Sequence, residues 1–257
     1  MFEVPEAYEK MMGRWSRQLA PLFVEFVGIR DGEKVLDVGC GTGALSSTLA
    51  KLTKAVKIVG IDPANGFIEY ARAQINDPRV TFEIGDAQAL PYTDGSFDTT
   101  MALLIVNFVP DAPKAMKEMC RVTKSGGIVA TTMWDGRANE LNRCLWDAAL
   151  AIDPPMKRPS ETGKYGSAER LSGLMQDAGL TNVTVGELNM PCHFSCFDDL
   201  WQRNLTGEGP QSAYVLGLQP DHREALKKRL RQNVLGDGPD KPFSLKAKAW
   251  AVRGAVP

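Results

Sequence analysis

The sequence predicts an α/β protein whose centre is a doubly wound, parallel β-sheet. Five short apolar segments alternate with stretches whose apolar residues recur every three or four positions, which is the pattern of strands joined by helical crossovers. A loop with three glycines follows the first apolar segment, and an aspartate lies near the end of each of the first three. Because parallel strands end at one edge of a sheet, we expect these groups to form a ligand site at that edge.

The elements before residue 135 follow this pattern in order. Large apolar residues three or four positions apart predict amphipathic helices in residues 5–27, interrupted near Pro21. Apolar runs and alternating residues predict strands, and the helical spacing between them predicts crossover helices. The expected strands are 35–38, 57–62, 80–84, 96–104 and 128–134, and the expected helices are 44–54, 65–76 and 113–122.

The alternation breaks after residue 134. A helix is expected at 139–151, followed by loops rich in proline and glycine that reach residue 166. An insertion at 135–168 lies at the ligand edge, where it forms a cap over a substrate or only packs against the core; both interpretations stay open. The remaining expected elements are helices at 168–178, 197–204 and 220–233 and strands at 182–189 and 243–252.

Composition limits the classes of function. The 257 residues have 30 Lys and Arg against 31 Asp and Glu, a formal net charge of −1, and no long basic run, so a nucleic-acid substrate is not expected. The chain lacks a long apolar run, and Glu3, Glu6 and Glu9 stand where a signal peptide would be basic. We expect one cytoplasmic domain without membrane spans, either monomeric or homodimeric.

Cysteine and histidine usage predicts neither disulfides nor a metal site. Five cysteines occur at irregular spacing and the chain has two histidines. Cys192, His193 and Cys196 are close in sequence, but a zinc site needs further ligands and the second histidine, His222, is distant. Free thiols fit a reducing compartment.

The loop after the first strand indicates the kind of ligand. Gly39, Gly41 and Gly43 form G-x-G-x-G, whereas a dinucleotide loop has the spacing G-x-G-x-x-G. Glycines allow a sharp bend and close approach of a ligand to the backbone. Asp37, two residues ahead of the first glycine, would repel a phosphate and attract a cation, such as the ammonium group of an amino acid.

The run Val35-Leu36-Asp37-Val38-Gly39-Cys40-Gly41-Thr42-Gly43 resembles the signature loop of class I S-adenosylmethionine (SAM)-dependent methyltransferases, in particular their small-molecule branch. Further similarities are the acid at the end of the second strand, Asp62, and the run Gly85-Asp86-Ala87 that precedes Leu90-Pro91. The resemblance implies a Rossmann-like sheet of seven mostly parallel strands, with the last strand antiparallel between the fifth and sixth.

The resemblance also implies roles for particular residues. Asp37 holds the ammonium group, Asp62 the ribose hydroxyls and Asp86 the adenine amino group, although each aspartate also suits a turn or a helix cap. Tyr8 and Trp15 lie in an N-terminal segment that often lids the cofactor in this family, or else only pack on the core. The cofactor-binding residues expected on this basis are Tyr8, Trp15, Asp37, Gly39, Gly41, Gly43, Asp62, Pro63, Asp86, Ala87, Leu103 and Leu104.

The implied organisation is one methyltransferase domain over 1–257. Residues 1–27 form the helical lid, 28–134 the SAM-binding half, 135–168 the substrate cap and 169–257 the rest of the sheet. The implied activity is transfer of a methyl group from SAM to O, N or C of a small molecule, leaving S-adenosylhomocysteine (SAH). A non-catalytic SAM-binding protein of the same fold and, less favoured, an NAD-dependent oxidoreductase are the alternatives.

No catalytic residue is assigned from the sequence. Methyl transfer is an in-line displacement that depends on positioning, and a general base is needed only when the acceptor must lose a proton. The candidate bases are His193, Asp135, Asp153 and Tyr165, none at a diagnostic spacing.

Overall fold

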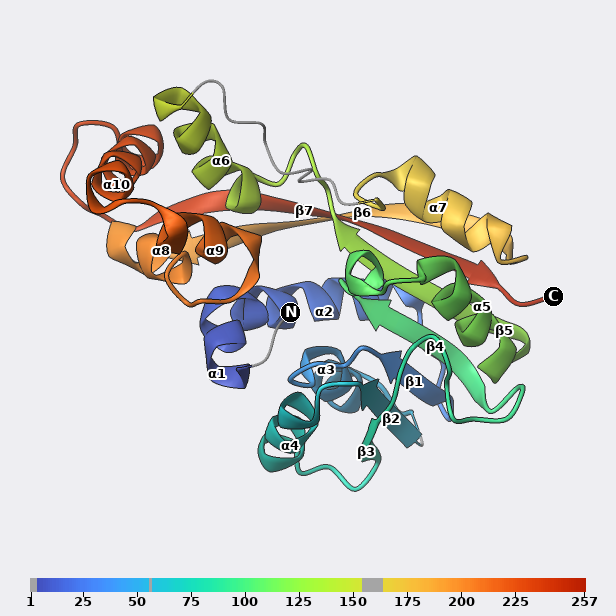
Figure 1. The fold of residues 1–257 in the computed structure, drawn as a ribbon. Coiled ribbons are helices and arrows are strands. Elements are labelled where there is room, and N and C mark those ends of the chain that lie inside the picture. Colours follow the sequence, from blue (N-terminus) through green and yellow to red (C-terminus); the bar gives the residue numbers. More distant parts are fainter. Residues whose placement is uncertain (1–3, 56, 154–163) are drawn as a thin grey trace.

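The computed structural model describes residues 4–55, 57–153 and 164–257 and contains a seven-stranded sheet (Figure 1). The strand order is β3-β2-β1-β4-β5-β7-β6. The final strand, β7, lies between β5 and β6 and is antiparallel to both, while β1 to β5 are parallel. The predicted fold is therefore confirmed. The strands are β1 (Lys34–Val38), β2 (Lys57–Asp62), β3 (Val80–Ile84), β4 (Phe97–Leu103), β5 (Thr123–Trp134), β6 (Thr181–Phe194) and β7 (Phe243–Ala255).

Helices cover both faces of the sheet. Helix α2 contacts α3, β5, β6 and β7, whereas α7 contacts β6, β7 and α5, and α5 contacts β4 and β5. The helices of the sheet layers are α2 (Arg14–Val27), α3 (Ala44–Leu52), α4 (Asn65–Gln74), α5 (Ala112–Val122) and α7 (Ala168–Asp177). The remaining helical elements are α1 (Pro5–Tyr8), the π-helix η1 (Glu9–Gly13), the 3-10 turn η2 (Val106–Phe108), α6 (Glu140–Ile152), α8 (Phe197–Arg203), α9 (Gly209–Gly217) and α10 (Pro220–Leu235).

The alternation of side chains along the strands divides the core between the two faces. On β1, Val35 belongs to the cluster beneath α2 and α3, and Leu36 to the cluster beneath α5 and α7. Successive side chains of a strand point to opposite faces. Both faces of the central strands are thus buried, which explains why these strands read as apolar runs rather than as alternating segments.

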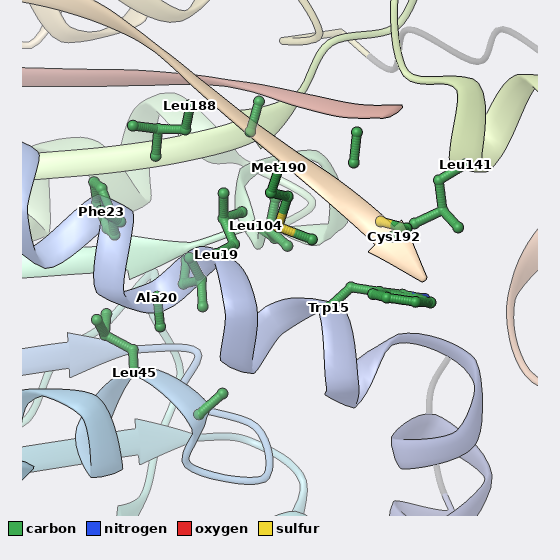
Figure 2. Packing of buried hydrophobic residues seen from close by; sticks show 14 of the residues in the cluster. Trp15, Leu19, Ala20, Phe23, Leu45, Leu104, Leu141, Leu188, Met190 and Cys192 are labelled. Atoms are coloured by element: carbon green, nitrogen blue, oxygen red, sulfur yellow. The ribbon is translucent and has the colours of Figure 1, made fainter. Parts of the chain in front are cut away.

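Helix α2 carries the largest side chains of the first cluster. In Figure 2 its residues Trp15, Leu19 and Phe23 follow one side of the helix, facing Leu188 and neighbouring residues of β6. All three are essentially unexposed. Burying an aromatic or leucine side chain stabilises a fold by roughly 1.5–3 kcal/mol, so α2 is part of the core.

The outer strands extend beyond the rest of the sheet. Strand β7 pairs with β5 from Ala255 to Ala249, and from Lys248 to Phe243 it pairs with β6 alone. This two-stranded arm reaches toward α6, α8 and α10 on the left of Figure 1. Residues 182–189 and 243–252 were expected as shorter strands, although buried and exposed residues alternate from Leu188 to Phe194. The proline at 191, which has no backbone N–H to donate, lies in this extension.

Three further features differ from expectation. Helix α2 continues through Pro21, where an interruption was expected. Strand β5 begins at Thr123, directly after α5, although Gly126 and Gly127 predicted a turn before residue 128. A Cβ atom at residue 127 would lie 2.6 Å from the carbonyl oxygen of Asp98, so the glycine permits close strand pairing instead. Helix α9 was not expected, since its glycine and proline residues read as a loop.

Candidate active site

One cavity of about 730 Å³ lies at the carboxyl ends of the parallel strands. Its size is within the range typical of small-molecule sites, roughly 300–1,000 Å³. One end is formed by the turns that follow β1, β2, β3 and β4, and the other by the N-terminal helices together with α6, α8 and α9. We call these ends the cofactor half and the acceptor half.

The glycine loop follows β1 in the cofactor half. Gly39, Gly41 and Gly43 have φ angles of 67°, 52° and 84°, a region that only glycine adopts at low cost. A Cβ atom at Gly39 would lie 2.7 Å from Ile105, and one at Gly43 2.5 Å from Ile75. At Gly41 nothing lies closer than a Phe67 atom at 3.9 Å, and Gly39 and Gly41 line the cavity.

The amides of this loop bond mainly to the protein itself. Those of Gly39 and Cys40 donate to the carbonyl of Ile61, and that of Gly43 donates to the carbonyl of Cys40. The amide of Gly41 donates to Oδ2 of Asp62 at 3.0 Å. With these four backbone donors engaged, the loop offers a ligand close approach, as expected of its glycines, rather than free amide groups.

Asp37 is fully buried at the end of β1 and lines the cavity. Its Oδ2 accepts a 2.7 Å hydrogen bond from Oγ of Ser46, while its Oδ1 has no partner among the described residues. Burial raises the pKa of Asp37 to about 7, against the effect of the Ser46 hydrogen bonds, and the nearby Asp62 adds to the increase. A buried carboxylate oxygen without a partner is costly, so this atom suits the ammonium group of a ligand.

Asp62 is the last residue of β2, the strand that pairs with β1, and its side chain bonds to the glycine loop. Its Oδ1 accepts from the amide of Ala64 at 2.9 Å and its Oδ2 from Gly41. Burial raises its pKa, and these two hydrogen bonds oppose the increase. Asp62 therefore shapes the glycine loop and the turn after β2, but it does not cap α4, whose first turn has no side-chain cap. It also lines the cavity together with Pro63, and each carboxylate oxygen retains acceptor capacity for ribose hydroxyls.

Asp86 and Ala87 lie in the turn after β3 and also line the cavity. Asp86 is exposed, and its Oδ1 accepts from the amide of Gln88 at 2.8 Å. The side-chain amide of Gln88 donates to both carboxylate oxygens at 3.1 Å. The turn thus holds the carboxylate in place at the edge of the cavity.

Leu103 and Leu104 form an apolar wall where β4 ends. Leu104 has φ = 63° although it is not a glycine, and its amide donates to the carbonyl of Thr132 at 3.0 Å. A non-glycine residue in this region costs of order 1–3 kcal/mol and persists where the surroundings determine it. Such strain is concentrated at functional sites, which agrees with its place in the cavity wall.

The two aromatic residues expected in the lid lie in different places. Tyr8 lines the cavity, with its ring centroid 5.4 Å from that of Phe67 and its hydroxyl 3.2 Å from Oγ of Ser16. Trp15 does not line it: the ring is 1% exposed and packs against Phe194 at 5.3 Å. Trp15 supports the lid from within the core, because the helix turns it toward β6. Gly43 likewise lies behind the cavity wall.

Sequence reasoning missed most of the acceptor half. Its wall combines apolar, aromatic and amide side chains with one guanidinium group: Met11, Met12, Trp134, Asn142, Trp146, Arg203, Pro210 and Gln211. Arg203, Asn142 and Gln211 belong to no motif in the sequence. Arg203 and Gln211 belong to 169–257, the region expected only to complete the sheet. The acceptor half is thus lined both by residues of the expected insertion, such as Trp146, and by residues beyond it, such as Arg203. Residues 154–163 of that insertion lie outside the described residues.

The candidate bases do not line the cavity. His193 is exposed and lies 2.7 Å from Oγ of Ser244, and Asp135 accepts from the amides of Arg137 and Ala138. Tyr165 is buried in the cluster beneath α5 and α7. Across the described ranges, no group of three or more His, Cys, Asp or Glu side chains could hold a metal ion. No described helix is long and apolar enough to cross a membrane.

These features define a class I SAM-dependent methyltransferase. The sheet order, the glycine loop with Asp37 before it, and the acids after β2 and β3 meet around one cavity, and the unpartnered Oδ1 of Asp37 fits the cationic end of SAM. Residues 29–178, more than half of the chain, match a family model described as a methyltransferase domain. The chain belongs to this methyltransferase family, and SAM is its cofactor.

Three comparisons illustrate the relationship. The chain is 29% identical over 185 residues to a demethylmenaquinone methyltransferase of Lactobacillus johnsonii, covering 65% of this chain and 76% of that protein. It is 30% identical over 216 residues to a 2-methyl-6-phytyl-1,4-hydroquinone methyltransferase of Synechocystis, covering 80% of this chain and 65%, just under two thirds, of that protein. The fold is similar to that of a Haemonchus contortus phosphoethanolamine N-methyltransferase whose structure contains phosphomonomethylethanolamine and SAH. The TM-score is 0.60 at 16% identity, and the match covers 98% of this chain and 57% of that chain.

Proposed function

We propose that this protein transfers the methyl group of SAM to a small organic acceptor held in the acceptor half of the cavity. The observation that carries the proposal is the continuity of one cavity from Asp37 and Asp62 to Trp134 and Trp146. Donor and acceptor can therefore lie in the same enclosed space, which in-line transfer requires. The named relatives that methylate quinone precursors support an apolar ring as the acceptor.

The residues of the cofactor half would hold SAM in an extended arrangement along the strand ends. Asp37 suits the ammonium group, Asp62 the ribose hydroxyls, and Asp86 with Ala87 the adenine, while Leu103, Leu104 and Tyr8 supply apolar contact. Bound SAM provides an activated methyl group on a sulfonium. What this chain adds is orientation of that methyl toward the acceptor half and exclusion of water by the helices that close over it.

The described lining of the acceptor half contains no side chain suited to be a general base. Within its described lining, the ionisable group is the guanidinium of Arg203, which does not accept protons at neutral pH. The acceptor must then react without losing a proton in the transfer step, or enter the site already ionised.

The test combines binding with turnover. Calorimetric titration of the full chain with SAM and SAH is expected to show one site, and a coupled assay for SAH release across quinols, phenols and amines is expected to show turnover on an apolar ring compound. Titration with NAD serves as the control for the oxidoreductase alternative. Binding of SAH without turnover on any ring compound would favour the non-catalytic alternative, and absence of SAM binding would overturn the proposal.

A further inference from the structure

Arg203 is a buried cation in the wall of the acceptor half. It ends α8, is 3% exposed and lines the cavity. Its Nε donates to the carbonyl of Met11 at 3.0 Å, Nη1 to the carbonyl of Leu141 at 3.2 Å and Nη2 to Oδ1 of Asn142 at 2.9 Å. Three elements, η1, α6 and α8, therefore converge on this one side chain.

The charge of Arg203 is not balanced by the protein. All three of its acceptors are neutral, and within the described part of the chain no carboxylate forms an ion pair with it. The charged or titratable groups near it are Arg14 on α2, Cys144 on α6 and Cys192 on β6. Arg14 is itself paired with Asp199 at 2.9 Å, so the neighbourhood keeps an excess positive charge.

This environment distinguishes Arg203 from an arginine that only connects structural elements by hydrogen bonds. Burial lowers the pKa of Arg203 to about 10, and burial raises the pKa of Cys144 and Cys192 to about 11 and about 12. At neutral pH the guanidinium is therefore charged and both thiols are neutral. A side chain that only joined two carbonyls and an amide would need no charge, and a buried unpaired charge is destabilising. The missing counter-charge belongs in the cavity.

The guanidinium group of Arg203 has N–H donors left for a negatively charged ligand. Of its five N–H groups, the three hydrogen bonds use one on each nitrogen, which leaves one on Nη1 and one on Nη2. Beside it, Asn142 and Gln211 line the cavity and are joined by a 2.8 Å bond from Nε2 of Gln211 to the carbonyl of Asn142. The rings of Trp134 and Trp146 supply apolar walls.

We propose that the methyl acceptor is an apolar ring compound with an ionised oxygen, and that Arg203 binds this oxygen. The proposal rests on the function proposed above and names its substrate class. The oxygen is that of an acidic ring hydroxyl or of a ring carboxylate. A ring carboxylate is already ionised in neutral solution, whereas a ring hydroxyl releases its proton to solvent on binding. The positive charge replaces a general base by stabilising the ionised form of the acceptor.

Three nitroarene probes test the proposal on the full chain saturated with SAH. para-Nitrophenol gives the ring hydroxyl, para-nitrobenzoate the ring carboxylate, and para-nitroanisole is the matched ether that cannot ionise. An opposite charge within about 4–6 Å shifts a pKa by roughly 1–3 units. We therefore expect at least one anion to bind about tenfold more tightly than the ether. The visible absorbance of bound nitrophenolate should show a pKa lower than in solution.

The outcomes distinguish a hydroxyl acceptor from a carboxylate acceptor. They also distinguish failure of the proposed role of Arg203 from failure of the proposed function. Tighter binding of nitrophenolate assigns a hydroxyl acceptor, and tighter binding of nitrobenzoate a carboxylate. Equal binding of all three probes, or no binding of any to the SAH complex, overturns the proposal. Failure of the parent protein to bind SAH would instead overturn the proposed function.

Variants then assign the preference to Arg203. In Arg203→Met the preference for the anion is expected to disappear, whereas Arg203→Lys should retain part of it, and both should bind SAH within about twofold of the parent. Arg14→Met removes a neighbouring guanidinium that does not line the cavity and should keep the preference. An undiminished preference in Arg203→Met overturns the proposal; if that variant does not fold, the parent measurements and Arg203→Lys still decide.

Discussion

The two halves of the cavity are built in different ways. The cofactor half consists of turns that come directly after consecutive strands, so that its acids, Asp37, Asp62 and Asp86, are placed by the parallel sheet itself. The acceptor half is assembled from η1, the end of β5, α6, α8 and α9, which are separated by up to 200 residues along the chain. Recognition of the methyl donor is therefore local in sequence, and recognition of the acceptor depends on tertiary packing.

The halves also differ in charge. Three carboxylates line the cofactor half, and one guanidinium lines the described part of the acceptor half. Burial, and to a smaller extent the proximity of Asp62, raises the pKa of Asp37 to about 7. The first half is thus suited to a positive ligand group and the second to a negative one, so changes in the cofactor half should affect SAH affinity most.

The largest effect is expected for Gly41→Val. This position has φ = 52° and lines the cavity, so a branched side chain both strains the loop and enters the space of the ligand. SAH affinity should fall by more than about 100-fold, equivalent to about 2.8 kcal/mol. Isothermal titration calorimetry measures this loss.

Gly32→Val is the matched control for that loss. Gly32 has φ = 83° in the turn before β1, with no atom within 4 Å of an added Cβ atom. It shares the backbone strain but lies outside the cavity lining. Its melting temperature should fall like that of Gly41→Val, while its SAH affinity stays near that of the parent. Equal affinity of the two variants would contradict the placement of the cofactor at the loop.

The second prediction concerns the charge of Asp37. Asp37→Asn removes the carboxylate expected to hold the ammonium group, and a hydrogen bond between charged groups contributes about 1.5–3 kcal/mol. SAH affinity at pH 8 should fall by about 30-fold, the equivalent of ~2 kcal/mol. Ser46→Ala, which removes the hydrogen bond to Oδ2 and retains the charge, should weaken binding less; the opposite order would contradict an electrostatic role.

The same variant should stabilise the free protein. The pKa of Asp37 is raised from 3.8 to about 7, so between these values the folded protein holds a proton that the unfolded chain lacks. Stability of the parent therefore falls as pH rises through this window. Relative to the parent, Asp37→Asn should gain roughly 1–3 kcal/mol at pH 8 and little at pH 4, measured by urea unfolding. A gain that is the same at both values would show that Asp37 does not titrate in this window.

These differences explain what the sequence could predict. The glycine loop, Asp37 and Asp62 lie within about 30 residues of one strand–helix–strand unit, where spacing alone places them. Arg203 reads as an ordinary charged residue at the end of a short helix. Only the docking of α8 against Met11 and Leu141, 192 and 62 residues away, buries it. Trp15 was expected among the cofactor-binding residues because of the family resemblance. Neither the resemblance nor the helical periodicity showed which apolar side chains turn toward β6.

A smaller effect is expected at Asp62, because the same carboxylate stabilises the glycine loop and is expected to bind the ribose hydroxyls. Asp62→Ala removes the acceptor of the Gly41 and Ala64 amides, and Asp62→Asn retains one oxygen. We expect about tenfold and threefold losses of SAH affinity, within the range of one or two hydrogen bonds.

An SAH analogue without ribose hydroxyls separates the two roles of Asp62. The parent should bind this analogue more weakly than SAH, whereas Asp62→Ala should bind both alike. If Asp62→Ala still prefers SAH by the full margin of the parent, Asp62 acts only by shaping the loop.

The smallest effect is expected where the halves meet, at Tyr8. Its ring lies against Phe67 of the cofactor half, while its backbone belongs to α1 beside the helices of the acceptor half. Tyr8→Phe retains this ring contact and should change SAH affinity by less than about twofold, whereas Tyr8→Ala should lose about fivefold, in line with an aromatic contact of about 1 kcal/mol. If Tyr8→Phe and Tyr8→Ala lose SAH affinity equally, the hydroxyl rather than the ring contributes to cofactor binding. If neither variant loses affinity, the N-terminal helices serve the acceptor half alone.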